Sequence, residues 1–149
     1  LGASAARGEV DLARASQRRV MSIGLMPGSR LPAHSTSMGR VLLAAMPDAE
    51  ARRVIEASDL SPRTRFSLTD PEEIMAQVQT ARTRGYAMVD QEVEISLRSL
   101  AVPVLNSKGT VVAALNTGMA ATQPDPAELI ESYLPALLKV QAGIARVLG

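Results

Sequence analysis

The stretch LPAHSTSMGRVLLA, from Leu31 to Ala44, decides how this chain folds. It opens with a proline that interrupts regular structure, continues through a lone histidine and a Ser-Thr-Ser run, and ends in apolar residues at helical spacing. Serine and threonine cap helix N-termini because their side-chain oxygens accept hydrogen bonds from the first unpaired backbone N–H groups. Ser35, Thr36 or Ser37 is therefore predicted to start a helix that continues through Met46.

The start of this helix also has a possible chemical role. The free N–H donors and the positive end of the helix dipole can hold a carboxylate or a phosphate. A well-capped helix without any ligand explains the same residues and is the commoner situation for such a motif. The motif alone leaves both interpretations open.

The composition excludes several classes of function. The 149 residues, of which 46% are hydrophobic, suffice for one globular domain with a real core. A net charge of +1 does not indicate a basic surface that would bind nucleic acid. The chain has no cysteine and one histidine, so neither a metal site nor a cofactor is predicted. No apolar run approaches the ~20 residues that cross a membrane, and a cytoplasmic protein is predicted.

Strands are predicted before the Leu31–Ala44 stretch and a short helix after it. Apolar residues alternate with polar ones over residues 9–15, and a second apolar segment covers 19–24, so both are predicted to be strands. A loop at 27–29 leads into the capped helix. Pro47 and Asp48 then break the chain, and Asp48 is predicted to cap a short helix.

A longer helix with clear end signals follows. Thr69 or Asp70 is predicted to cap it, and Pro71 takes the first helical position, where its missing N–H is not needed. Gly85 is the residue expected just beyond the last turn, because glycine adopts the left-handed conformation without steric cost.

The C-terminal half returns to strands and ends in a helix. Three strands are predicted, over residues 86–89, 98–105 and 110–117. The last two form a hairpin around the turn at 106–109, and Pro103 puts the first of them at an edge or a bulge. Asp125 is predicted to cap a final helix that Pro135 kinks or breaks. The order β-β-α-α-α-β-β-β-α predicts an α+β fold with a mainly antiparallel sheet covered by helices.

Two sets of polar residues are candidates for a site. The acidic run VDQEVE contains Asp90, Glu92 and Glu94, which are most simply a solvated loop or partners for arginines such as Arg98. Asp90 is kept as a candidate because it lies where a strand ends.

The second set lies on the predicted hairpin. Ser99 shares a strand face with Leu97, and Thr117 shares one with Leu115, because side chains alternate along a strand. We expect these faces to line one small-molecule pocket, with Arg98 and Asn116 pointing away from it. An ordinary core with hydrogen-bonded hydroxyls explains the pattern equally well.

Three motifs in order resemble the effector-binding domain of IclR-family bacterial transcription regulators. They are GSRLPAHSTSMGRVLLA (28–44), GYAMVDQEVEISLRSLAVPV (85–104) and GTVVAALNTG (109–118). The similarity is greatest to the branch that controls protocatechuate and 4-hydroxybenzoate catabolism. It implies a GAF-like domain over residues 1–149, with a curved, mainly antiparallel sheet flanked by helices. It also implies that a winged helix-turn-helix domain and the first elements of this domain precede residue 1 in a longer protein.

The resemblance also implies a set of ligand-binding residues. Ser37 and Met38 would offer backbone N–H groups to an effector carboxylate, and Ser99 and Thr117 would add hydroxyls. His34 would hydrogen-bond a ring hydroxyl or hold the loop, and leucines would form apolar walls. The full set is Met26, Leu31, His34, Ser37, Met38, Asp90, Leu97, Ser99, Leu115 and Thr117.

The predicted function is therefore a non-catalytic sensor of a small organic acid, most simply an aromatic one. The domain would form a homodimer or tetramer and would act on DNA only through the missing domain, with no membrane involved. Two alternatives remain open. One is a dimerisation module with a vestigial pocket, and the other is a small serine hydrolase that uses Ser37 and His34, although no orienting acid lies at recognisable spacing.

Overall fold

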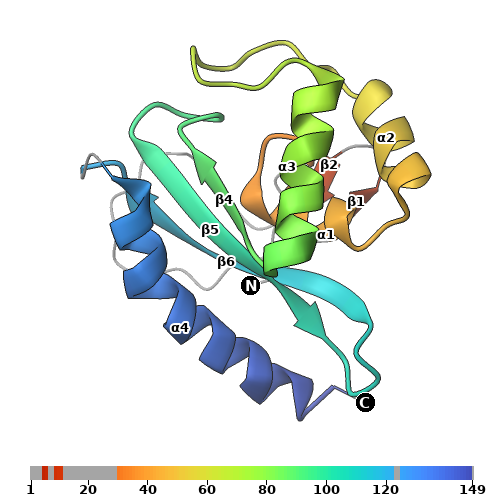
Figure 1. Cartoon of the computed structure of the whole chain (residues 1–149), viewed down its shortest axis with the longest axis vertical. Coiled ribbons are helices and arrows are strands. Elements are labelled where there is room, and N and C mark those ends of the chain that lie inside the picture. The colour runs from red at the N-terminus through yellow and green to blue at the C-terminus, as the bar shows by residue number, and fades with distance from the viewer. Residues whose placement is uncertain (1–4, 7–8, 12–29, 123–124, 149) are drawn as a thin grey trace.

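The computed structural model describes residues 5–6, 9–11, 30–122 and 125–148. The strands that it describes form two antiparallel sheets (Figure 1). One sheet contains β1 (Ala5–Ala6), β2 (Glu9–Asp11) and β3 (Arg30–Pro32). The other contains β4 (Ala87–Asp90), β5 (Leu97–Leu105) and β6 (Val111–Ala120), with β5 in the centre.

Helices cover both faces of the β4–β5–β6 sheet (Figure 1). They are α1 (Ser37–Ala44), α2 (Asp48–Glu56), α3 (Pro71–Arg84) and α4 (Pro126–Ala145). Ala87, Ala101 and Ala114 of the sheet pack into one apolar cluster with α1, α2 and α3. Leu100 and Leu115 pack into a second cluster with α4. The sheet is thus a middle layer, which confirms the predicted α+β class.

Most predicted helix ends are confirmed. Thr36 caps α1, and its Oγ1 accepts a hydrogen bond from the Gly39 N–H at 3.1 Å. Asp70 caps α3, and Asp125 caps α4 in the same way. Gly85 ends α3 in the left-handed conformation at φ 83°. These ends were predictable because each cap bond joins residues two or three positions apart.

The prediction for the start of α2 is wrong. Pro47 occupies the N-cap position, and no side chain there makes a cap bond. Asp48 is instead the first helical residue, and its carboxylate binds the Arg82 guanidinium of α3 at 2.6 Å. A negative charge in the first turn still suits the helix dipole, but the contact that holds it comes from another helix.

Other differences concern strands and the last helix. β3 was not predicted, because it is short and its last residue is Pro32, which was expected to interrupt regular structure. The expected strand at 19–24 lies outside the described residues. The hairpin of β5 and β6 is confirmed, and β6 extends to Ala120. α4 runs through Pro135 as one helix, so the predicted break into two segments does not occur. None of the described helices is both long and apolar enough to cross a membrane.

Gly39 lets the chain pack closely at the start of α1. Every residue of this helix is buried. A Cβ on Gly39 would lie 2.1 Å from the Ala33 backbone oxygen, much closer than atoms can approach. The turn that carries His34 and Ser35 therefore rests directly on the first turn of the helix, and only glycine allows this contact.

Gly39→Ala should consequently destabilise the domain by about 3 kcal/mol or more, because the backbone of the turn must move to admit the methyl group. Gly143→Ala is the matched control, since a Cβ on this α4 glycine meets nothing within 4 Å. It should leave stability unchanged or raise it by about 0.5–1 kcal/mol, through better helix propensity. Urea unfolding of the two variants tests this, and equal effects would contradict the close packing.

Candidate functional site

The N-terminus of α1 presents unpaired backbone donors inside the protein. The Gly39 N–H donates to Thr36 Oγ1, and the Arg40 N–H donates to the Thr36 carbonyl at 3.0 Å. Among the described residues, no acceptor is found for the Ser37 and Met38 N–H groups. Because these donors lie at the positive end of the helix dipole, the position suits an anion.

Unpartnered polar side chains surround these donors. Ser35 Oγ, Ser37 Oγ and His34 Nδ1 are buried, and none of them has a hydrogen-bond partner within the part of the chain that the structure describes. Ser37 is only 1% exposed. Leaving a buried polar group unpaired costs about 1–3 kcal/mol, so three such atoms on four consecutive residues form an unusual concentration. Together with the free N–H groups, they match the hydrogen-bonding needs of a small polar ligand.

The surroundings of His34 favour its neutral form. Burial lowers the pKa of its imidazole, and the positive charge of Arg40 lowers it further, against an opposing effect of Glu92. A neutral imidazole carries one N–H donor and one acceptor nitrogen, so it can bind a hydroxyl in either direction. Ser37 Oγ has no hydrogen-bond partner, so the nucleophile–base contact that a serine hydrolase needs is not formed.

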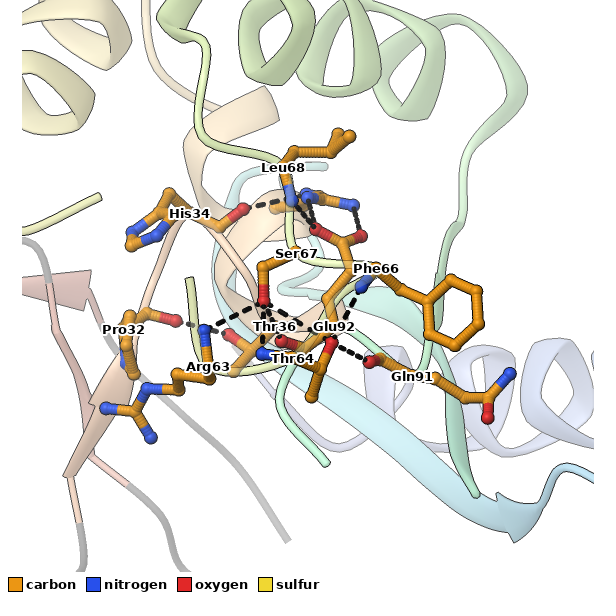
Figure 2. A network of polar contacts seen from close by, with 11 residues as sticks. Pro32, His34, Thr36, Arg63, Thr64, Phe66, Ser67, Leu68, Gln91 and Glu92 are labelled. Carbon is orange, nitrogen blue, oxygen red and sulfur yellow. Dashed lines mark hydrogen bonds and ion pairs between the residues drawn. The ribbon is translucent and has the colours of Figure 1, made fainter. Parts of the chain in front are cut away.

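A buried ion pair fixes the position of this helix start (Figure 2). Arg40 is 2% exposed and Glu92 is 6% exposed. Two guanidinium nitrogens of Arg40 each donate to a carboxylate oxygen of Glu92 at 2.7 Å. The third nitrogen, Nε, donates to the His34 carbonyl at 2.8 Å. The loop that bears the unpartnered polar groups is thus anchored to α1 through a guanidinium whose three nitrogens all donate hydrogen bonds.

Glu92 extends the network to a second loop (Figure 2). Its Oε1 accepts a hydrogen bond from the Leu68 N–H at 3.2 Å, and its backbone carbonyl accepts one from Ser67 Oγ at 2.6 Å. Thr64 Oγ1 donates to the neighbouring Gln91 carbonyl at 2.6 Å. Three loops, around residues 34, 67 and 92, therefore meet at one buried charge pair.

The register of the hairpin corrects the predicted pocket face. Ser99 pairs with Gly118, and Leu100 pairs with Thr117. Directly paired residues point to the same face of an antiparallel sheet, and Leu100 belongs to the α4 cluster. Thr117 therefore lies on the α4 face, opposite to Ser99, and the expectation that they share one face is wrong.

A β-bulge explains this error. Leu105 pairs with Val111, and continuation of that register would place Ser99 opposite Thr117, on the same face. The irregularity between Val104 and Leu105 adds one residue on β6. Since a shift of one residue moves every later side chain to the other face, Asn116 takes the face that was expected for Thr117.

Asp90 also lies on the α4 face. It pairs with Arg98 in the β4–β5 register, and its carboxylate accepts a hydrogen bond from Arg98 Nε at 2.7 Å. Asp90 therefore lies on the opposite face of the sheet from Ser99, and the simpler expectation, an arginine partner, is confirmed. Glu94 is half-buried rather than solvated, with Oε2 buried and unpartnered. The described residues contain no cluster of three or more His, Asp or Glu that could hold a metal ion.

The remaining predicted residues divide between the two faces. Met38 and the half-buried Leu31 pack in the cluster around α1, and Leu97 lies two residues before Ser99 on the same strand face. Leu115 belongs to the α4 cluster, on the other face from Ser99. Met26 lies outside the described residues.

The family description "Bacterial transcriptional regulator IclR C-terminal" matches residues 10–146. The chain belongs to the IclR family. The Pca regulon regulatory protein of Pseudomonas putida is 45% identical over 124 residues, which is 83% of this chain and 43% of that protein. The chain thus spans less than half of this curated relative, whose name is that of a regulator and not of an enzyme.

Two solved structures of the family contain aromatic acids. One is a double mutant of the inducer-binding domain of the Acinetobacter PobR transcription factor, in complex with 3-hydroxybenzoic acid. It is 30% identical, with a TM-score of 0.89 over 99% of this chain and 87% of that one. The other is an IclR homologue from Microbacterium hydrocarbonoxydans complexed with 4-hydroxybenzoate, 29% identical, with a TM-score of 0.82 over 97% of this chain and 58% of that one.

Sequence reasoning missed Arg40, Glu92 and Asn116. A signal for the ion pair was available, because an arginine within a fully apolar helix needs a buried counter-charge and the acidic run offered one. Asn116 is half-buried, pairs with Ala101 on the face that α1 covers, and makes no side-chain hydrogen bond among the described residues. Its orientation depends on the bulge next to Pro103. Pro103 indicated an edge or a bulge, but not which strand would carry the extra residue.

Removing one partner of the buried pair should destabilise the domain by about 3–5 kcal/mol, because the other charge stays buried without compensation. Arg40→Met and Glu92→Leu should each do so. The double variant should lose less stability than the sum of the two single losses. Arg52→Met is the control, because its ion pair with Glu72 is exposed and should contribute little. Urea unfolding measures all four, and a loss for Arg40→Met no larger than for Arg52→Met would contradict the role of the pair.

Proposed function

We propose that this domain binds a small aromatic carboxylic acid as the effector of a transcriptional regulator. The observation that carries the proposal is the set of buried, unpaired donors at the N-terminus of α1. Two relatives of the same fold are described as complexes with hydroxybenzoic acids, which are aromatic carboxylates. The unpaired donors suit a carboxylate, and the ligands of these two relatives carry one.

The effector carboxylate is proposed to bind the Ser37 and Met38 N–H groups. The hydroxyls of Ser35 and Ser37 can donate to the same oxygens, because neither hydroxyl is committed to another partner. A carboxylate that accepts several N–H and O–H bonds at a helix start needs no cationic side chain to neutralise it. This matters here because the nearest buried cation, Arg40, is already used by Glu92.

The ring is proposed to lie against the sheet face that α1 covers. Leu31 and Leu97 would supply apolar contact, as predicted from the sequence. Ser99 and Asn116 would form hydrogen bonds with polar substituents of the ring. Neutral His34 would add one further hydrogen bond to a ring hydroxyl. Asp90, Leu115 and Thr117 lie on the α4 face and are not part of this proposal.

The regulatory role concerns a protein longer than this chain. We propose that a separate DNA-binding domain in the cytoplasmic full-length regulator responds to the effector, and that the regulator is a dimer or tetramer. An effector can change DNA binding only to the extent that it binds two arrangements of the assembly with different affinity. This domain would supply that difference through the α1 site.

The proposal predicts that one backbone N–H controls affinity for carboxylates. Proline lacks this group and is tolerated at the first position of a helix, and Thr36 has the extended conformation that a following proline requires. Ser37→Ala removes only the hydroxyl, whereas Ser37→Pro removes the N–H as well. Calorimetric titration with 4-hydroxybenzoate should give a further loss in affinity of about tenfold or more for Ser37→Pro relative to Ser37→Ala.

Circular dichroism would check that both variants remain folded. Equal affinity of the proline and alanine variants would contradict the helix-start site. A folded wild-type domain that binds none of benzoate, 4-hydroxybenzoate and protocatechuate would contradict the proposed function and favour a dimerisation module.

The sheet register gives a second test, with adjacent residues as variant and control. Asn116→Leu should weaken binding of 4-hydroxybenzoate by about tenfold relative to benzoate, because benzoate has no ring hydroxyl to lose a hydrogen bond. Thr117→Val, on the α4 face, should leave the ratio of the two affinities unchanged. The opposite result, with the ratio changed only by Thr117→Val, would place the ligand on the other face of the sheet.

A further inference from the structure

A second cavity lies at the other end of α1. It has a volume of about 130 Å³ and opens between the C-terminal end of α1, the end of α3 and the β5–β6 hairpin. Small residues line much of it, namely Ala44 and Ala45 from α1 and its cap, and Ala81 and Gly85 from α3. Because their side chains are so short, these two helix ends leave space between them.

The other walls of the cavity are apolar except for one residue. Val41, Pro103 and Val111 complete the apolar part. Arg82 is the single charged residue in the lining. The class of ligand that the cavity can bind therefore depends on which parts of the Arg82 guanidinium are not already hydrogen-bonded.

The edge of the Arg82 guanidinium is already used. Its Nε donates to the Ala44 carbonyl at 2.8 Å, and Nη2 donates to the Met46 carbonyl at 3.0 Å. Nη1 donates to the Asp48 carboxylate at 2.6 Å, which also balances its charge. These three bonds fix the guanidinium plane, so the group cannot turn toward an anion without breaking them. The flat face of the guanidinium makes none of these bonds, and a guanidinium face can bind an aromatic ring.

The volume agrees with one small ring. An apolar cavity of about 150 Å³, engineered in another protein, binds benzene. The cavity here is slightly smaller and half-open, with Ala45 exposed at its rim. The lining contains neither a buried hydroxyl nor a free carboxylate that would favour a polar ligand.

We propose that this cavity is a second ligand site, which takes a small uncharged aromatic ring stacked on Arg82. It is separate from the polar site, because Ser37 and Ala44 stand seven residues apart on α1, about 10 Å along the helix axis. The two sites share no residue, so the proposal does not depend on the identity of the carboxylate effector. It adds to the domain a class of ligand that carries no charge.

Titration with benzene tests the site, followed by calorimetry or by shifts of methyl NMR signals. Wild type should bind with a Kd of about 1 mM, as a six-atom apolar ligand can reach. Ala45→Leu fills the mouth of the cavity and should weaken binding at least about tenfold. The matched control is Ala57→Leu, because Ala57 caps α2 with nearly the same backbone angles as Ala45 and does not line the cavity. It should leave the Kd within about twofold of wild type.

Cyclohexane and iodobenzene complete the experiment. Cyclohexane has no π face, so it should bind more weakly than benzene if the ring stacks on Arg82. Iodobenzene soaked into wild-type crystals should place anomalous iodine density beside Ala44 and Ala81. The proposal is overturned if benzene binds Ala45→Leu as it binds wild type, or if the iodine lies elsewhere. It is also overturned if benzene does not bind wild type. In that case, a change of oligomeric state in Ala45→Leu would assign the cavity to a second copy of the chain.

Discussion

The buried bond between Arg40 and Glu92 is the constraint on which the rest of the site depends. Two charges inside an apolar core are tolerable only when every donor and acceptor is used, and here the guanidinium satisfies both carboxylate oxygens and the His34 carbonyl. That requirement sets the distance between the helix start and two loops that are remote in sequence. The loops are thereby held in place. Among the described residues, they bring no acceptor to the Ser37 and Met38 N–H groups.

The same pair explains why the proposed anion site needs no free cation. A mobile lysine or arginine beside the helix start would compete for the carboxylate and would bring its own counter-ion requirement. With Arg40 neutralised by Glu92, the remaining attraction comes from backbone dipoles and hydroxyls, which are fixed before any ligand arrives. Selectivity then rests on the shape of the site and on hydrogen bonding, and charge alone does not decide it.

The sequence was sufficient for local features and insufficient for those that depend on distant contacts. Thr36, Asp70 and Asp125 were identifiable as caps because a cap bond spans two or three residues. The family followed from three motifs in order, and the fold class from the order of elements. The Arg40–Glu92 pair joins residues 52 positions apart. The bulge at Val104 and Leu105 alters the face of Thr117, and Pro103 indicated an edge or a bulge there without indicating the extra residue on β6. The alternation within each strand was therefore assigned correctly, but the faces of β6 were reversed relative to those of β5.

The alternation along β6 has a consequence for how this domain can evolve. Asn116 faces α1 and Thr117 faces α4, although they are adjacent in the chain. A change of one codon can therefore alter the chemistry of the proposed ligand face, while the neighbouring residue continues to serve the packing of the C-terminal helix. Natural variants that recognise different acids can arise by single steps that leave the other layer intact, so a lineage can diversify its inducers without rebuilding its core.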